Sequence, residues 1–237
     1  ATYKRFDGLD TLNVEHISTT ELTTRIRWTK DEEFLSGSFD RTALRSPYPI
    51  LSFQGIFGFK DVFGSDYNYQ KLEFQFEHNT QLGVLGRMRY GFTVGYINGI
   101  AAYPLLKVHD GNQSLWLLTS ATNMVNFLEF ISDRYVIGFA ENKWEGLLFD
   151  RIPLVKKSKI RLVTTERIML GSLSSKQNQA LIIPSFVQPF NGVPYVEIGV
   201  GIENIFKVLR IDLLYRATHQ IPGTSPFGIK ARYSLNF

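Results

Sequence analysis

The stretch FGIKARYSLNF at 227–237 alternates apolar and polar side chains without interruption. The apolar parity consists of Phe227, Ile229, Ala231, Tyr233, Leu235 and Phe237. The other parity consists of Gly228, Lys230, Arg232, Ser234 and Asn236. Successive side chains of a β-strand point to opposite faces. The stretch therefore predicts a strand with one apolar face and one polar face.

A strand that ends on a phenylalanine carboxylate is typical of the closing strand of a bacterial outer-membrane barrel. In such barrels this strand is also the tag that the insertion machinery reads. We expect an insertion signal made of Phe227, Ile229, Tyr233, Leu235 and Phe237. An amphipathic edge strand of a soluble sheet would show the same alternation, so the rest of the chain has to decide between the two.

The same alternation recurs along the whole chain, in segments bounded by turn-forming residues. Ten such segments lie near residues 16–29, 34–45, 49–60, 68–80, 87–99, 133–148, 159–172, 194–203, 205–218 and 226–237. Most are about 10–14 residues long, whereas a tilted membrane strand needs about 9–11 and ordinary strands usually have about 5–6. Short turns alternate with longer loops between them, as in antiparallel membrane barrels.

The composition excludes several classes of protein. The chain has 237 residues, 44% of them hydrophobic, and a mean hydropathy of −0.08. No apolar run approaches the ~20 residues that a transmembrane helix needs, so any membrane crossing would use strands. The chain has no cysteine, which excludes disulfides and thiolate ligands. The net charge of +4 is spread along the strands and does not predict a nucleic-acid partner.

Two folds share this pattern and differ in the face that they enclose. A soluble sandwich buries its apolar side chains, whereas a membrane barrel turns them to lipid and encloses the polar ones. Aromatic residues make up 14% of the chain, which suits the interfacial girdles of a barrel and equally a large aromatic core. Small residues on the polar parity relieve crowding inside a narrow barrel. This parity holds Gly91, Gly95, Gly199, Gly201 and Gly228.

We therefore predict an all-β fold, an antiparallel transmembrane β-barrel of about ten strands, either closed or the C-terminal part of a larger barrel. Residues 1–15 would be an N-terminal periplasmic lead-in. Residues 16–237 would form the outer-membrane barrel, with a long external loop at 100–132. Within that loop, 121–131 has the spacing of an amphipathic helix. We expect this helix to pack on the barrel rim or to contact another protein.

The polar parity is rich in charge, and a barrel would enclose it as a lumen charge network. The network consists of Glu21, Arg25, Arg27, Lys71, Glu73, Glu77, Arg87, Arg89, Arg161, Arg167, Glu197, Arg210, Asp212, Arg216, Lys230 and Arg232. Enclosed charges must be paired, so we expect them to fill the interior, with the basic excess held by anions or water. The alternative is an open cationic channel that favours anions.

The sequence offers weak signals for catalysis or metal binding. His109 is followed by Asp110 in the longest loop, and Ser114 and Ser120 are near in sequence, so a hydrolase is conceivable. A polar turn in an external loop is the favoured interpretation of these residues, and no GxSxG motif is present. The histidines lack metal-binding spacing, and the aspartates lack a calcium-loop pattern. We expect no catalytic residues, no metal and no cofactor.

Several stretches together resemble one protein family. They are GSDYNYQK at 64–71, AYPLLKVH at 102–109, EFISDRYV at 129–136, FDRIPLVKK at 149–157 and PYVEIGVGIENIFKVLRIDLLYR at 194–216. The set is similar to the C-terminal region of an uncharacterised Bacteroidetes-type outer-membrane family, from about Ile17 onward. Family members are longer and usually carry an N-terminal carboxypeptidase-regulatory-like domain, which this sequence lacks. The resemblance implies an outer-membrane location and a barrel fold, and it implies no reaction.

These observations lead to one expectation of function. We expect an integral outer-membrane β-barrel protein that is not an enzyme and is structural, or accessory to surface-protein assembly or transport. The expected partners are outer-membrane lipid and lipopolysaccharide, the barrel-insertion machinery and other outer-membrane proteins, and no nucleic acid. The alternatives are a small anion-favouring channel, an outer-membrane hydrolase using His109 and Asp110, and a soluble lipocalin-like barrel.

Overall fold

The computed structural model describes residues 3–6, 11–14, 16–37, 41–144, 160–181 and 183–233. Regular structure in these ranges is almost entirely β, which confirms the all-β prediction. The strands are β1 (Tyr3–Phe6), β2 (Thr11–Val14), β3 (Glu21–Trp28), β4 (Glu33–Ser36), β5 (Arg41–Arg45), β6 (Ile50–Gly58), β7 (Tyr69–Gln81), β8 (Arg87–Gly99), β9 (Lys107–Val108), β10 (Ile131–Ser132), β11 (Arg134–Trp144), β12 (Arg161–Ser172), β13 (Tyr195–Ile205), β14 (Leu209–Arg216) and β15 (Phe227–Tyr233). The helical elements are η1 (Gly83–Leu85), η2 (Tyr103–Leu105) and α2 (Ser175–Ala180).

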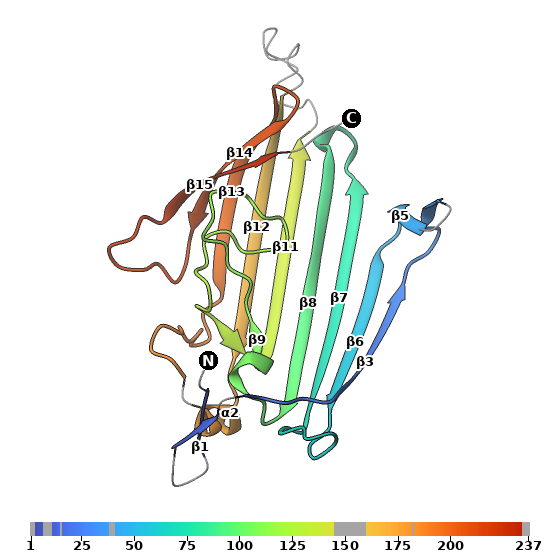
Figure 1. Cartoon of the computed structure of the whole chain (residues 1–237). Coiled ribbons are helices and arrows are strands. Elements are labelled where there is room, and N and C mark those ends of the chain that lie inside the picture. Colours follow the sequence, from blue (N-terminus) through green and yellow to red (C-terminus); the bar gives the residue numbers. More distant parts are fainter. Residues whose placement is uncertain are drawn as a thin grey trace.

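Nine strands form one antiparallel sheet in the order β15-β14-β13-β12-β11-β8-β7-β6-β3 (Figure 1). In the main sheet, each strand pairs with its neighbours along the chain, once the small separate pairs β4–β5 and β9–β10 are set aside. This meander follows from the alternating segments, because antiparallel neighbours need only short connections. Among the residues that the structure describes, no helix is both long and apolar enough to cross a bilayer.

Apolar side chains of β7 and β8 meet across the strand pair and fix its register. Phe74 lies opposite Val94, and Phe76 lies opposite Phe92. The rings of Phe76 and Phe92 stack with their centroids 5.4 Å apart. Each such cross-strand pair contributes roughly 0.2–1 kcal/mol. A slip by one residue would move every side chain to the other face, so the alternation selects this register.

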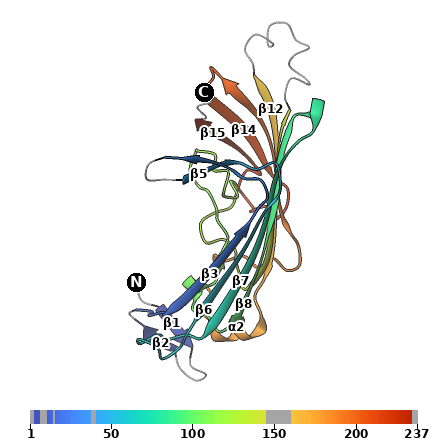
Figure 2. The ribbon, with the colours of Figure 1, turned by 90° about the vertical axis from the view of Figure 1, so that its right-hand side faces the viewer.

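The sheet is curved and open (Figure 2), and β3 and β15 are its two edges. Among the described residues no pairing joins these edges, so the prediction of a closed barrel is wrong. At the edge strand β15, Ala231 has a backbone partner in the long loop. Its N–H donates to the carbonyl of Leu115 at 3.0 Å, and its carbonyl accepts from the N–H of Leu117 at 2.7 Å. The long loop thus meets this edge in an isolated bridge at Ala231.

The predicted strand at 34–45 differs from the structure in a second way. It forms two short strands, β4 and β5, which pair with each other and not with the main sheet. The connection between the two strands includes residues 38–40, which lie outside the described residues.

The predicted helix at 121–131 is also absent; the segment runs through turns instead. The amides of Asn123 and Met124 donate to the carboxylate of Glu197, at 3.1 and 2.7 Å, rather than to carbonyls within a helix. Leu128 adopts a φ of 60°, which a right-handed helix cannot contain. Tertiary hydrogen bonds therefore override the local helical spacing. The one described α-helix, α2, was not predicted.

The two faces of the sheet are covered very differently. The apolar parity forms the convex face, where Phe92, Ile211 and Leu213 remain 41%, 40% and 51% exposed. The polar parity forms the concave face, against which the loop at 100–132 packs (Figure 2). Arg210 on that face is only 2% exposed. The sheet therefore leaves its apolar side open and encloses ionic side chains, the opposite of a soluble sandwich.

Buried apolar side chains gather between the concave face and the loops that cover it. One cluster contains Tyr69, Ile97, Ala101, Leu106 and Ile131. A second cluster contains Val125, Phe130, Met169, Phe190 and Tyr195. Each cluster joins residues of the sheet to residues of the loops at 100–132 or 173–194, so these clusters hold the loops on the sheet.

Candidate functional site

The register of the C-terminal strands places predicted charges beside one another on the concave face. Glu197 of β13 lies between Arg167 of β12 and Arg216 of β14. Asp212 of β14 lies opposite Lys230 of β15. Opposite charges placed directly across a strand pair stabilise it. Backbone pairing alone therefore assembles this part of the predicted network.

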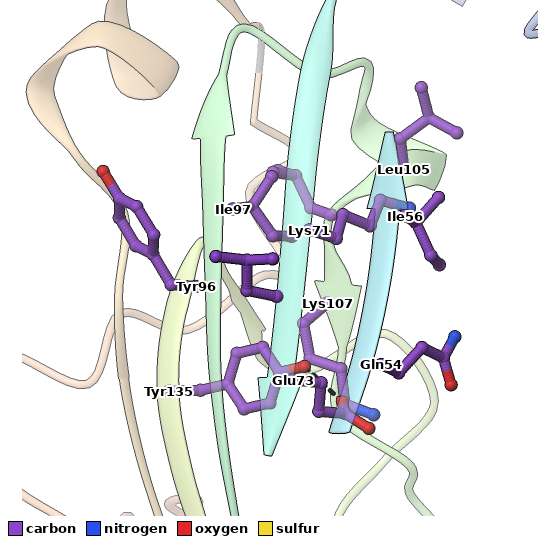
Figure 3. A pocket seen from close by; sticks show the side chains of 11 residues that line it. Gln54, Ile56, Lys71, Glu73, Tyr96, Ile97, Leu105, Lys107 and Tyr135 are labelled. Atoms are coloured by element: carbon purple, nitrogen blue, oxygen red, sulfur yellow. Dashed lines mark hydrogen bonds between the residues drawn. The ribbon is translucent and has the colours of Figure 1, made fainter. Parts of the chain in front are cut away.

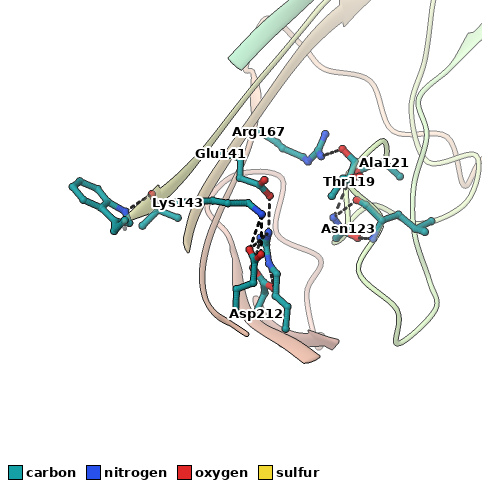
Figure 4. A network of polar contacts seen from close by, with 12 residues as sticks. Thr119, Ala121, Asn123, Glu141, Lys143, Arg167 and Asp212 are labelled. Atoms are coloured by element: carbon teal, nitrogen blue, oxygen red, sulfur yellow. Dashed lines mark hydrogen bonds and ion pairs between the residues drawn. The ribbon is translucent and has the colours of Figure 1, made fainter. Parts of the chain in front are cut away.

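Arg210 is the centre of an ion-pair cluster that we call the arginine cluster. It comprises Arg210, Asp212, Glu141, Glu203 and Lys143 (Figure 4). The guanidinium of Arg210 donates two hydrogen bonds to Asp212, at 2.8 and 2.7 Å, and one to Glu141 at 2.7 Å. Lys143 reaches Glu203 at 2.8 Å. Such a cluster is tolerable at low exposure because each charge has a partner with good geometry.

A glycine makes room for the carboxylate of this cluster. A Cβ on Gly201 of β13 would lie 2.4 Å from Oδ1 of Asp212. Gly95 of β8 plays the same part for Tyr135, whose ring would lie 2.0 Å from an added Cβ. The glycines on the polar parity thus let long polar side chains lie flat across the neighbouring strand.

A second group of side chains fixes the loop at 100–132 to the sheet; we call it the loop anchor. It comprises Glu129, Glu197, Arg216 and Lys230. Arg216 contacts Glu129 of the loop at 2.5 and 3.2 Å and the carbonyl of Met124 at 3.0 Å. Lys230 donates to the carbonyl of Asn112 at 3.0 Å. These buried cations satisfy loop carbonyls that would otherwise be isolated from water.

The N-terminal half of the concave face is far more open. Every residue of β3 is exposed, including Glu21, Arg25 and Arg27. The pair between Arg89 and Glu77 is formed at 2.8 Å, with both side chains about 40% exposed. Exposed ion pairs contribute little, typically about 0–1 kcal/mol. Lys71, Glu73 and Arg87 belong to this half as well.

A cavity of about 150 Å³ lies where the loop meets this open half (Figure 3). Its polar lining includes Lys71, Glu73 and Lys107. The hydroxyl of Tyr135 donates to Glu73 at 2.5 Å across the cavity wall. The cavity is small, and its two cations lie beside one carboxylate that already accepts a hydrogen bond.

His109 lies deep under the loop and away from the residues predicted to work with it. Its Nε2 is 2.9 Å from the hydroxyl of Ser132, not near Ser114, and the ring is fully buried. Asp110 is exposed and contacts Lys107 at 4.0 Å. Burial, and secondarily the charge of Lys107, lowers the pKa of His109 to about 3. An imidazole without solvent access gives the hydrolase hypothesis no support.

The predicted insertion signal is only partly described. Phe227, Ile229 and Tyr233 lie on the convex face and are 55%, 67% and 66% exposed. Leu235 and Phe237 lie outside the described residues. The ring of Tyr233 lies 5.4 Å from that of Trp116, so the loop extends the apolar face past the edge of β15. Glu166 is an exposed carboxylate on the same convex face, and we have no physical account of it.

Several residues of the two groups escaped the sequence analysis. Glu203 shares the polar parity of Glu197, so the alternation of its strand could have identified it. Glu141 and Lys143 share the parity of Tyr135 in β11. Apolar residues on both parities of that strand hid this relation. Glu129 lies within 121–131, where the sequence has helical spacing but the structure has turns, so the periodicity could not place this side chain.

The fold and the site together define an all-β protein whose open antiparallel sheet holds an ionic face beneath its own loop. Residues 7–202 match the family described as "Family of unknown function (DUF5686) C-terminal domain". Because the match spans most of the chain, the chain belongs to this family. No curated protein matches the chain. The coarser part of the resemblance, the C-terminal region of a family without an established function, is thereby confirmed.

Proposed function

We propose that this chain is the membrane-embedded β-domain of an outer-membrane protein, with its convex face against lipid acyl chains. The single observation that supports this most is the exposed apolar parity. Its members include Leu22, Ile26, Trp28, Phe53, Phe74, Phe92, Val94, Tyr96, Val136, Ile168, Leu170, Ile198, Val200, Ile202, Ile211, Leu213, Phe227, Ile229 and Tyr233. Soluble monomers rarely expose contiguous apolar patches beyond a few hundred Å².

The length of the apolar face suits a bilayer. On β8 the convex residues lie within the nine-residue stretch from Met88 to Tyr96. A strand tilted by about 45° needs about 9–11 residues to cross the hydrocarbon core. Tyr90 and Tyr96 lie toward the two ends of this run, where interfacial aromatic side chains are favoured.

The ionic face supports a filled interior over an open channel. The loop at 100–132 bonds to the concave side of β12–β15, and the arginine cluster is self-paired. We therefore propose a structural or accessory role in surface-protein assembly or transport, and not catalysis. Its partners would be outer-membrane lipid and lipopolysaccharide, the insertion machinery that reads the final strand, and other outer-membrane proteins.

An open sheet also fits the proposal that this domain is the C-terminal part of a larger barrel. Closure would need further strands, and β3 offers a long edge for them. The resemblance to a Bacteroidetes-type outer-membrane family that usually carries an N-terminal carboxypeptidase-regulatory-like domain supports the same view.

A charge placed on the convex face tests the proposal. Leu213 lies in the middle of β14 and is half exposed. In a lipid-facing strand, Leu213→Arg should cost about 2–4 kcal/mol of the unfolding free energy in vesicles. On a water-facing surface the same change should cost less than about 0.5 kcal/mol. Urea titration of the protein folded into vesicles would measure the difference.

Val84→Arg is the matched control, because Val84 is 77% exposed in the turn beyond the end of β7. It should leave the unfolding free energy nearly unchanged. Equal effects of the two substitutions, or a wild-type protein that stays in the aqueous phase without detergent, would contradict a membrane location.

A further inference from the structure

A cavity of about 320 Å³ lies on the concave face at the end of the sheet that carries the 82–86 and 204–208 turns. Four neighbouring parts of the chain contribute to its wall: the β7–β8 hairpin, the adjacent ends of β11 and β12, the ends of β13 and β15, and Thr119 of the long loop. It adjoins the arginine cluster, since Glu141, Glu203 and Lys143 belong to both (Figure 4).

The wall of this cavity is strongly cationic. Its basic side chains are Arg87, Arg89, Lys143, Arg161 and Arg232. Its acidic side chains are Glu141 and Glu203. The lining therefore carries a formal excess of three positive charges at neutral pH.

Both carboxylates of the lining already form ion pairs within the arginine cluster. Glu141 accepts from Arg210 at 2.7 Å, and Glu203 lies 2.8 Å from Lys143. Both are well buried, at 15% and 1% side-chain exposure. Among the described residues, neither Arg161 nor Arg232 has a carboxylate within ion-pair distance. Within the part of the chain that the structure describes, these two guanidinium groups therefore line the cavity without forming an ion pair.

The strand register decides which charges meet directly across the sheet. Arg232 of β15 lies opposite Arg210 of β14, whose own charge is already paired with Asp212 and Glu141. Arg161 of β12 lies opposite Glu203 of β13, which is paired with Lys143. Like charges placed directly across a strand pair destabilise it, so an anion in the cavity would offset the charge of Arg232.

We infer that this cavity binds a phosphate-bearing anion, with Arg161 and Arg232 as its principal contacts. Guanidinium groups bind phosphate oxygens with paired hydrogen bonds and stay charged at every relevant pH. A phosphate carries about two negative charges, which suits the two guanidinium groups of Arg161 and Arg232 better than the single charge of a carboxylate does. The volume accommodates a group larger than a single phosphate. The source is either a free phosphate compound or a phospholipid headgroup.

Inorganic pyrophosphate is a suitable probe. The full chain, purified in a nonionic detergent, would be titrated by calorimetry at constant ionic strength. We expect saturable binding by the wild type and affinity weaker by at least about tenfold in the double variant Arg161→Gln/Arg232→Gln, because two charge-assisted contacts are removed. Failure of the wild type to bind, or equal binding by the variant, would overturn the inference.

A double variant of equal charge, Arg25→Gln/Arg134→Gln, controls for general electrostatic attraction. Arg25 lies in the exposed β3, and Arg134 lies at the opposite end of β11. This control should bind pyrophosphate as the wild type does. If the control lost pyrophosphate affinity to the same extent, net charge alone would explain the loss, and the inference of a specific site would be overturned.

Stability provides a readout that separates binding from folding. Without pyrophosphate, Arg161→Gln/Arg232→Gln should unfold at the same urea concentration as the wild type or at a higher one, because repulsion is relieved. A lower midpoint would mean that these arginines support the fold, and it would refute the inference.

Vesicles distinguish the two sources of the phosphate group. Pyrophosphate affinity would be compared in phosphatidylcholine vesicles and in vesicles that also contain phosphatidylglycerol. Weaker affinity with phosphatidylglycerol assigns the site to a lipid headgroup, and unchanged affinity assigns it to a free phosphate compound. The detergent titration does not require membrane insertion, so its result is independent of the proposed function.

Discussion

The two ends of the sheet present the same kind of ionic face in opposite ways. At the C-terminal end, Arg210, Arg216 and Lys230 are 2%, 4% and 8% exposed. At the N-terminal end, every residue of β3 is exposed. Both ends show the same alternation of apolar and polar side chains. Alternation therefore decides which residues share a face and leaves open whether that face is covered.

The cover is the loop at 100–132, and it is bonded most firmly to the C-terminal end of the sheet. Its hydrogen bonds with side chains of the concave face include those of Arg167, Glu197, Arg216 and Lys230 on β12–β15. Toward the other end, Leu106 packs on Tyr69 and Ile97 of β7 and β8. No described segment covers β3, whose residues are all exposed. Charges at the covered end need internal partners, whereas water can solvate those at the open end.

The largest test of this contrast removes one carboxylate from each end. Asp212→Ala should lower the unfolding free energy by about 3–5 kcal/mol, because it removes one of the carboxylates that neutralise the buried Arg210. Glu77→Ala, at the exposed pair with Arg89, should cost less than about 1 kcal/mol. Urea titrations of the two variants measure both values. Similar losses would show that the two ends do not differ in burial.

A smaller effect depends on pH and on the buried imidazole under the loop. The pKa of His109 is lowered from its ordinary value of 6.5 to about 3. Its contribution to stability is therefore complete above pH 6.5 and is lost as the pH falls toward 3, on the order of 2–4 kcal/mol. His109→Gln should flatten this part of the profile of unfolding free energy against pH.

His16 is exposed and serves as the control for that measurement. His16→Gln should leave the slope between pH 6.5 and 3 as in the wild type. A wild-type profile that is flat across this window would contradict the buried, neutral state of His109.

The smallest expected effect is local to the loop anchor. The two carboxylate oxygens of Glu197 accept hydrogen bonds from the backbone amides of Asn123 and Met124. Glu197→Gln leaves only one acceptor oxygen for these two amides. We expect a local loss of about 1–3 kcal/mol, seen as faster hydrogen exchange at Asn123 and Met124. Glu73→Gln changes a carboxylate of the open half and should leave exchange at these amides unchanged. Equal acceleration by both would mean that the loop is not anchored at Glu197.

Much of the fold could be predicted from local pattern, and the failures have local causes. The strands of the main sheet were anticipated because a period of two follows from strand geometry at each residue. The strand at 34–45 was wrong because its two halves, β4 and β5, pair with each other instead of extending as one strand. The helix at 121–131 failed because Glu197, distant in sequence, takes up the amides that a helix would have used.

The candidate site was predictable in part for the same reason. The alternation of side chains predicts that Arg210, Asp212 and Glu197 share the polar face, and the register of β13 and β14 confirms it. The role of Glu129 could not be predicted in this way, because it comes from a loop and meets Arg216 at a sequence separation of 87 residues. His109 was assigned to the wrong neighbours, since adjacency in sequence pairs it with Asp110 while the fold pairs it with Ser132.

The sequence by itself determined the β class, the two parities and the charge that one of them carries, because these depend on the geometry of consecutive residues. Only the tertiary structure decided which charges are enclosed, which partners neutralise them and where the long loop meets the edge strand β15. Those outcomes depend on where a loop of about thirty residues packs, and its path is fixed by buried contacts with strands more than seventy residues away along the chain.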